Sequence, residues 1–144
     1  MTYAILNVVT TQIHFHQNLD VLVNPHKNMN PIIVFHNPRC SKSRQTLALL
    51  DSIDVKYETF LYLENEISYE EFLRILGLLK LKPRDILRVK EKEYLENKLN
   101  NMDLTDDDII KIVLKSRKLI ERPIAIKGKK AVIARPLEKV LQVL

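Results

Sequence analysis

The chain has 144 residues, 46% of them hydrophobic and 28% charged, with a single cysteine and a formal net charge of +5. This length suits one domain with its own core, and a single cysteine excludes both an intramolecular disulfide and a cysteine-only zinc site. No apolar run approaches the roughly 20 residues of a membrane-spanning helix. The basic residues neither form a long block nor alternate with aromatic ones, so we expect no membrane or nucleic-acid partner.

The first 28 residues differ in composition from the rest of the chain. Their only charged residues are Asp20 and Lys27, so the whole positive excess lies further along. Met29 stands shortly before an apolar run, and nothing after it requires what precedes it. We therefore interpret 1–28 as an N-terminal extension and 29–144 as a single domain. The alternative is that the segment AILNVV of the extension contributes a genuine extra strand.

The beginning of the chain, MTYAILNVVTTQIHFH, has no positively charged n-region and no clear small-residue cleavage site, so we expect no signal peptide. A lone cysteine also fits a reducing compartment, and we expect a cytoplasmic protein. His14 and His16 resemble half of a metal site, but no third ligand follows at a suitable spacing. We therefore predict no metal.

A strand, a helix and a second strand are expected at the beginning of the domain. Residues 31–35, PIIVF, form a continuous apolar run rich in β-branched side chains, which indicates a buried strand. Residues 41–53 carry an apolar helical face, and residues 55–63 alternate as in a strand. Such a βαβ unit has parallel strands and a right-handed crossover. We expect Tyr57 and Tyr62 to be core or edge residues of the second strand rather than ligands.

The middle of the domain is expected to be helical. Ser68 has a glutamate three residues after it, and Thr105 is followed by three aspartates, so each marks a helix N-terminus. Between these two helices, Pro83 opens a short helix that ends near Arg88. We treat the whole stretch as a helical insertion between two groups of strands.

The last part of the domain returns to strands. Residues 124–126 and 131–134 are short apolar runs on either side of KGKK, where Gly128 can adopt the positive φ of a tight hairpin. Pro136 ends the second run, and the apolar residues after it predict a closing helix. The order βαβ, helical insertion, ββα predicts an α/β fold with a mixed four-stranded sheet flanked by helices.

Cys40 lies where the first strand gives way to the first helix, with Arg39, Lys42 and Arg44 beside it. Backbone N–H groups at a helix N-terminus carry a partial positive charge, and together with nearby cations they stabilise a thiolate. The same N–H groups can hold an anion next to the sulfur. Lone cysteines are more often small buried hydrophobic residues, but a turn between arginine and lysine is a poor hydrophobic niche. We predict that Cys40 is a nucleophile beside a bound anion.

The segment HNPRCSKSRQTL is similar to the active-site segment of the glutaredoxin-linked arsenate reductases, in which His-Asn-Pro-x-Cys-x-x-Ser-Arg precedes the first helix. Four further motifs of that family follow in the same order and at similar spacing. They are FLYLEN at 60–65, the arginine that ends DILR, ERPI at 121–124 and ARPLEKVL at 134–141. The resemblance covers essentially all of 31–144. It implies a thioredoxin-like fold with a helical insertion, which agrees with the predicted element order.

The resemblance also implies which residues carry the chemistry. Cys40 is the expected nucleophile, and Arg88, Arg122 and Arg135 are expected to line an oxyanion pocket. Guanidinium groups suit a tetrahedral oxyanion because they bind its oxygens in charge-assisted, often bidentate pairs and stay protonated throughout. The alternative for each arginine is an ordinary surface role, for example a salt bridge between Arg88 and Glu91.

Four further residues are expected to support the thiol. By the family pattern, His36 and Arg44 belong to the loop that tunes Cys40, and Pro123 corresponds to the cis-proline that thioredoxin-like proteins keep beside the active cysteine. Ser43 stands where a Cys-x-x-Cys motif would have its second cysteine, so the chain has no internal resolving thiol.

The resemblance implies an oxidoreductase that reduces arsenate, or a related oxyanion, to arsenite in the service of arsenic resistance. It implies glutathione as external reductant and glutaredoxin as partner, with no bound cofactor. Two alternatives share the fold: a Spx-like transcriptional regulator that contacts RNA polymerase, and a thiol oxidoreductase with another substrate. The regulator is disfavoured because its redox switch is Cys-x-x-Cys, which this chain lacks.

Overall fold

The computed structural model describes residues 31–144 of the chain. The predicted extension, with its histidine pair and its alternative strand, lies outside the described residues. In chain order the elements are β1 (Ile32–Phe35), α2 (Ser41–Ser52), β2 (Tyr57–Phe60), α3 (Tyr69–Leu79), the 3₁₀ helix η1 (Pro83–Ile86), α4 (Lys92–Glu96), α5 (Asp106–Lys115), the 3₁₀ helix η2 (Arg117–Leu119), β3 (Ile124–Lys127), β4 (Lys130–Ile133) and the 3₁₀ helix η3 (Leu137–Val143).

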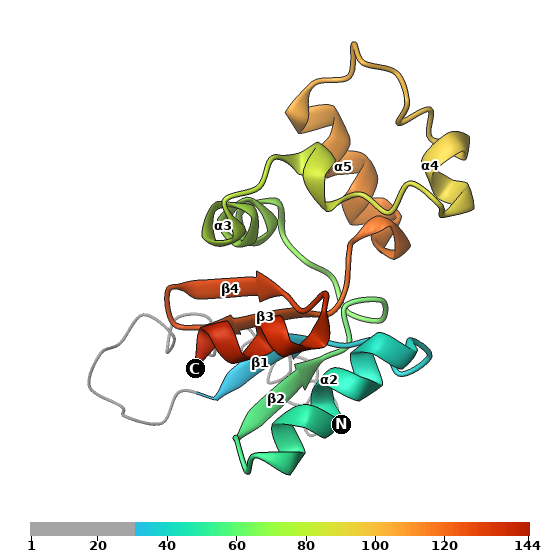
Figure 1. The fold of residues 1–144 in the computed structure, drawn as a ribbon. Helices are drawn as coiled ribbons and strands as arrows, with labels where there is room; N and C mark the ends of the chain where they lie inside the picture. Colours follow the sequence, from blue (N-terminus) through green and yellow to red (C-terminus); the bar gives the residue numbers. More distant parts are fainter. Residues whose placement is uncertain (1–30) are drawn as a thin grey trace, which may run out of the picture.

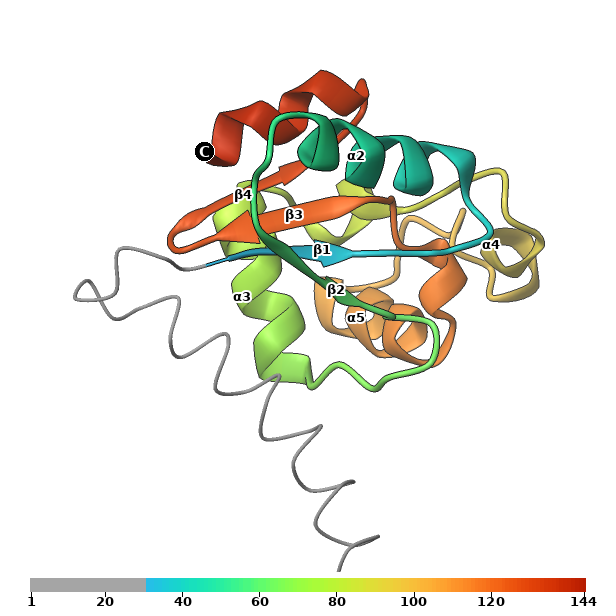
Figure 2. The same ribbon diagram turned by 90° about the horizontal axis from the view of Figure 1, so that it is seen from below.

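The strands form one mixed sheet in the order β2-β1-β3-β4. β1 pairs with β2 in parallel, and β3 is antiparallel to both β1 and β4. Helices α2 and η3 cover one face of the sheet, while α3 and α5 lie on the other (Figures 1 and 2). The predicted α/β class and the mixed four-stranded sheet with a helical insertion are confirmed.

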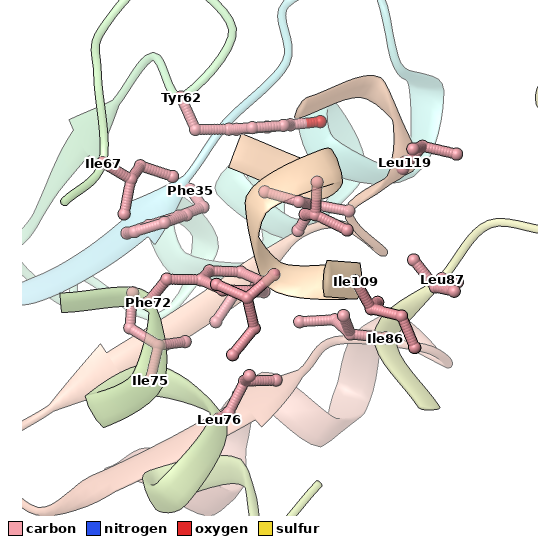
Figure 3. Packing of buried hydrophobic residues seen from close by; sticks show 14 of the residues in the cluster. Phe35, Tyr62, Ile67, Phe72, Ile75, Leu76, Ile86, Leu87, Ile109 and Leu119 are labelled. Carbon is pink, nitrogen blue, oxygen red and sulfur yellow. The ribbon is translucent and has the colours of Figure 1, made fainter. Parts of the chain in front are cut away.

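β1 is apolar along its whole length because both faces of the sheet are covered. Ile32 and Val34 pack in the smaller core with residues of α2 and η3. Ile33 and Phe35 pack in the larger core with residues of the helical insertion (Figure 3). Each such side chain contributes about 1.5–3 kcal/mol when it is fully buried. The strand is therefore held firmly at its C-terminal end, where the chain enters the turn before Cys40.

The residues expected to form the apolar face of the first helix are only partly buried. Leu50 is fully buried, but Ile53 lies just beyond the end of α2 and is 42% exposed. The other buried residues of α2 are Ser43 and Thr46. They can be buried because their hydroxyls are hydrogen-bonded, that of Thr46 donating to the carbonyl of Lys42 at 2.9 Å. The N-terminal half of α2 thus buries polar side chains beside Cys40.

β2 is shorter than the predicted strand at 55–63. It ends at Phe60, and the chain then turns: the N–H of Tyr62 donates to the carbonyl of Phe60 at 3.0 Å, and that of Asn65 to Leu61 at 3.1 Å. The alternation of residues continues past the strand, but the pairing with β1 does not. Tyr62 is therefore a turn residue, although it is fully buried as expected.

The C-terminal segment and the insertion also differ in detail from the prediction. The closing helix is a 3₁₀ helix, in which Val140 and Val143 are buried three residues apart while Leu141 is exposed. Neither α4 nor η2 was predicted, because α4 buries no residue and η2 has only three. The insertion therefore contains more helical segments than its apolar spacing indicates.

The predicted local signals are otherwise present. Ser68 accepts a hydrogen bond from the N–H of Glu71, and Thr105 forms a reciprocal capping box with Asp108. Gly128 has a φ of 61° in the hairpin between β3 and β4. Across residues 31–144, no helix has the length and apolar character needed to cross a membrane.

Candidate active site

Cys40 is the N-cap residue of α2. Its backbone is extended (φ −92°, ψ 120°), and its carbonyl accepts the first bond of the helix, from the N–H of Arg44 at 3.1 Å. Its own N–H donates to the carbonyl of Asn37 at 2.9 Å. The thiol therefore stands at the open end of the helix, where the N–H groups of the first turn have no partners within the helix.

The turn between β1 and α2 is tied to the first turn of the helix by Ser43. Its Oγ lies 2.8 Å from Nδ1 of His36 and accepts a hydrogen bond from the N–H of Asn37 at 3.1 Å. His36 and Asn37 are both buried. Ser43 thus fixes the path of the chain on either side of Cys40.

Arg44 contacts the loop rather than the thiol. Its Nη1 donates to the carbonyl of Pro38 at 2.7 Å. Burial lowers the pKa of His36, and the charge of Arg44 lowers it further, so the imidazole is neutral at neutral pH. His36 therefore adds no positive charge near Cys40 and acts here as a hydrogen-bonding residue of the loop.

The environment of Cys40 favours the thiolate. Burial raises the pKa of the thiol, but three groups together outweigh that effect and lower the pKa below its usual value. They are the backbone N–H of Ser43, the side chain of Arg122, which acts as a hydrogen-bond donor and through its charge, and the backbone N–H of Lys42. The predicted ionisation of the thiol at the helix N-terminus thus has a defined physical cause.

Arg122 is the arginine that faces the thiol. Its side chain is only 14% exposed, and its Nη1 lies 3.4 Å from the carbonyl of Lys118 and 3.7 Å from Oε1 of Glu91. Its Nε is buried and has no hydrogen-bond partner among the described residues. A buried guanidinium N–H without an acceptor is uncommon, and it indicates a position where a ligand oxygen would complete the site.

Arg88 and Arg135 join this cluster through carboxylates. Arg88 donates from Nε to Glu91 at 3.0 Å and from Nη1 to Glu121 at 3.1 Å. Arg135 lies with its Nε 2.9 Å from the same oxygen of Glu121 and 2.6 Å from the carbonyl of Arg122. The salt bridge between Arg88 and Glu91, named above as the alternative, is therefore present. It is not an isolated surface pair, however, because Glu91 also lies near Arg122 and the pair is part of a larger network.

The peptide bond between Arg122 and Pro123 is cis, as the family resemblance implies. A second cis bond, between Arg135 and Pro136, was not predicted. The N–H of Ala134 donates to the carbonyl of Pro123 at 2.9 Å, so the two arginine-proline segments run next to each other.

The arrangement brings a stabilised thiolate, helix N–H groups and three guanidinium groups into one region. Such a set suits a tetrahedral oxyanion, whose oxygens accept hydrogen bonds and whose central atom can be attacked by sulfur. In the described part of the chain, no three histidine, cysteine, aspartate or glutamate side chains gather as a metal site would require.

The ArsC family model matches residues 35–143, which is most of the domain. The chain belongs to the ArsC family. It is 41% identical over 114 residues to a protein of Haemophilus influenzae named arsenate reductase, an alignment that covers 78% of this chain and 98% of the relative. It is also 41% identical over 113 residues to a protein of Escherichia coli named uncharacterized protein YfgD, covering 76% of this chain and 93% of the relative.

The solved structures agree with this assignment. A structure titled arsenate reductase from Vibrio cholerae has a TM-score of 0.76 and 40% sequence identity, covering 79% of this chain and 98% of that one. The predicted membership of the ArsC family and the thioredoxin-like fold are therefore confirmed. The site described above occupies the turn after β1, the segment after η1 that carries Arg88, the segment before β3 and the segment after β4.

Two residues that contact or border the candidate site were not assigned to it from the sequence. Glu121 holds two arginines through one oxygen, and Tyr62 lies close enough to Cys40 and Arg122 for their charges to act on its hydroxyl. Both lie within motifs that were recognised, ERPI and FLYLEN. For Glu121, the available signal was its position directly before a predicted site arginine. For Tyr62, the expectation of a core residue is confirmed, and its hydroxyl lies where the buried ring borders the site.

The lowered pKa of Cys40 predicts fast alkylation near neutral pH. The thiolate is the reactive form and is populated above the pKa, so a lowered pKa moves the midpoint of the rate profile to lower pH. We expect iodoacetamide to modify the native protein with a midpoint below that of a free cysteine in the same buffers. A midpoint at or above that of the free cysteine would contradict the stabilised thiolate. Because Cys40 is the only cysteine, the measured rate belongs to this residue alone.

Proposed function

We propose that this protein is a cytoplasmic arsenate reductase that converts arsenate to arsenite with glutathione and glutaredoxin. Cys40 is the nucleophile, and Arg88, Arg122 and Arg135 bind the oxyanion. His36, Ser43, Arg44 and Pro123 support the loop and the segment that hold these groups. Several relatives of the chain that are similar over most of its length carry the name arsenate reductase, which supports arsenate as the substrate.

The placement of Arg122 beside Cys40 is the observation that carries this proposal. A single guanidinium lowers the pKa of the thiol and, at the same time, keeps a buried Nε without an acceptor. A neutral substrate would leave that donor unpaired, whereas an arsenate oxygen would accept from it. The same residue thus activates the nucleophile and offers a contact to the anion that the nucleophile attacks.

In the proposed reaction, the sulfur of Cys40 attacks arsenic, and one arsenate oxygen leaves as water after taking up two protons. This gives a covalent sulfur–arsenic(V) adduct. During the attack, negative charge shifts among the arsenate oxygens, and N–H and guanidinium donors already in place lower the barrier because they need not reorganise. The backbone N–H groups of Lys42 and Ser43, which act on the thiol as hydrogen-bond donors, are among these donors.

The electrons come from outside the chain. Glutathione displaces a second arsenate oxygen, which leaves as water, and so becomes bonded to the arsenic of the adduct. A glutaredoxin thiolate then attacks the glutathione sulfur and forms a mixed disulfide, which leaves two electrons on arsenic. Water finally hydrolyses the remaining bond between Cys40 and arsenic(III), which releases arsenite and regenerates the thiol. No resolving cysteine is required within the chain, which agrees with its single thiol. External thiols of this kind are maintained in a reducing cytoplasm.

The test is a coupled assay with the purified full chain, glutathione, glutaredoxin, glutathione reductase and NADPH. We expect NADPH oxidation that depends on arsenate, on this protein and on glutaredoxin. Turnover only when thioredoxin and its reductase replace the glutathione system would contradict the choice of partner but not the substrate. No turnover from a folded protein whose Cys40 still reacts with iodoacetamide would contradict arsenate reduction and favour another thiol substrate or a regulatory role.

A further inference from the structure

Tyr62 is held rigidly at the boundary between the core and the active site. Its ring stacks on that of Phe35, with centroids 6.1 Å apart and an interplanar angle of 14°. Its carbonyl accepts a hydrogen bond from Nε of Arg117 at 2.6 Å. Figure 3 shows the ring at the edge of the apolar cluster, with its oxygen directed away from Ile67. Because Phe35 is the last residue of β1, the stacked pair places the tyrosine next to the turn that carries Cys40.

The hydroxyl of Tyr62 is buried, and its O–H has no acceptor among the described residues. Buried polar atoms almost always have a partner, and an unpaired one destabilises the fold. The guanidinium of Arg122 acts on the hydroxyl through its charge and as a hydrogen-bond donor, which can occupy only a lone pair of the phenol oxygen. The O–H of Tyr62 and the buried Nε of Arg122 both still lack an acceptor, and a ligand oxygen near both would satisfy them.

We propose that the hydroxyl of Tyr62 donates a hydrogen bond to a tetrahedral oxyanion bound against Cys40, alongside Nε of Arg122. Tyr62 is then a substrate-binding residue, and its ring forms the apolar wall of the anion site. This inference rests on the proposed function in so far as the oxyanion is arsenate, but the binding it describes can be measured without turnover.

The surroundings of the hydroxyl suit a neutral donor. Burial raises the pKa of Tyr62 to about 12, although the charges of Arg122 and Arg88 lower it, so the hydroxyl keeps its proton at neutral pH. An anion there would gain a hydrogen bond without a further charged group being buried. Oxyanions offer acceptor oxygens in several directions, so one ligand can satisfy a phenol and a guanidinium at once.

The variant Tyr62→Phe removes only the hydroxyl and keeps the buried ring. Anion affinity is measured in the full chain by the protection of Cys40 from iodoacetamide at increasing arsenate or phosphate concentration, because Cys40 is the only cysteine. We expect the concentration for half protection to rise on the order of 10-fold, as for the loss of one hydrogen bond to a charged group. Without anion, the alkylation rate should change little and the melting temperature should not fall, since an unpaired hydroxyl is removed.

Tyr57→Phe is the matched control, because it removes a tyrosine hydroxyl five residues away, in β2, where the group bonds Asp51 on the surface. We expect wild-type protection from this variant. If Tyr62→Phe is folded and is protected as well as the wild type, the proposal is wrong; it is equally overturned if neither anion protects the wild-type protein. If anions protect the wild type and Tyr62→Phe weakens this, the inference stands even when the coupled assay shows no arsenate turnover, so the two proposals can fail separately.

Discussion

Replacement of Cys40 by serine is expected to abolish arsenate-dependent NADPH oxidation. A serine hydroxyl is not ionised near neutral pH and cannot form the sulfur–arsenic bond, so the reaction loses its nucleophile altogether. We expect kcat to fall by at least about 1,000-fold, the scale seen when a nucleophile is removed from an enzyme that otherwise still binds its substrate. The measurement is the coupled assay with saturating glutathione and glutaredoxin.

The position of Cys40 makes this variant easy to interpret. Its side chain forms no cap hydrogen bond at the beginning of α2, whereas serine is a preferred N-cap residue. Cys40→Ser should therefore be at least as stable as the wild type in thermal unfolding, and a loss of activity cannot be ascribed to unfolding. Residual activity above about one tenth of the wild-type value would show that another group starts the reaction, and it would contradict the roles given above.

Replacement of Arg122 by alanine is the second large effect. The variant removes the cation beside the thiol and a donor to the substrate together, so the pKa of Cys40 should rise and kcat/KM should fall. By analogy with the removal of one preorganised donor from an oxyanion site, we expect a decrease of about 100- to 1,000-fold. The pH profile of alkylation and the coupled assay measure the two consequences separately.

Two further variants separate the effect of the charge of Arg122 from the effects of its geometry and position. Arg122→Lys keeps a charge but loses the planar fork. Compared with Arg122→Ala, it should therefore bring the pKa of Cys40 part of the way back down, but it should recover little of kcat/KM. Arg39→Ala removes a cation that is next to Cys40 in sequence but exposed to solvent, and we expect nearly wild-type behaviour. If Arg39→Ala and Arg122→Ala lowered kcat/KM equally, general positive charge rather than the position of Arg122 would be responsible.

The parts of the fold that follow from local patterns were predictable. The apolar run of β1, the N-caps at Ser68 and Thr105 and the glycine of the hairpin each depend on a few neighbouring residues. The end of β2 was not, because alternation continues in the sequence after the pairing with β1 stops at Phe60. The burial of Ser43 was also hidden, since a serine becomes a core residue only when partners such as His36 come from another segment.

The sequence allowed the residues of the candidate site to be proposed, but not the contacts between them. Cys40 and its arginines were singled out because they lie in motifs with recognisable order and spacing. The pairing of Arg88 with Glu121 joins residues 33 positions apart, and nothing in the local sequence of either indicates it. That the buried O–H of Tyr62 lacks an acceptor is even harder to predict, because it depends on the positions of all the surrounding residues in the folded chain.

The carboxylate of Glu121 gives the site a property that its arginines alone would lack. One oxygen holds Arg88, which follows η1 in the helical insertion, and Arg135, which follows β4 in the sheet. The distance between cations on the two parts of the fold is thus set before any ligand arrives. Long flexible side chains that are ordered during folding need not be ordered again on binding, so less conformational entropy is lost when the oxyanion enters. An acidic residue that repels an anion at long range thereby preorganises the groups that we propose to bind it.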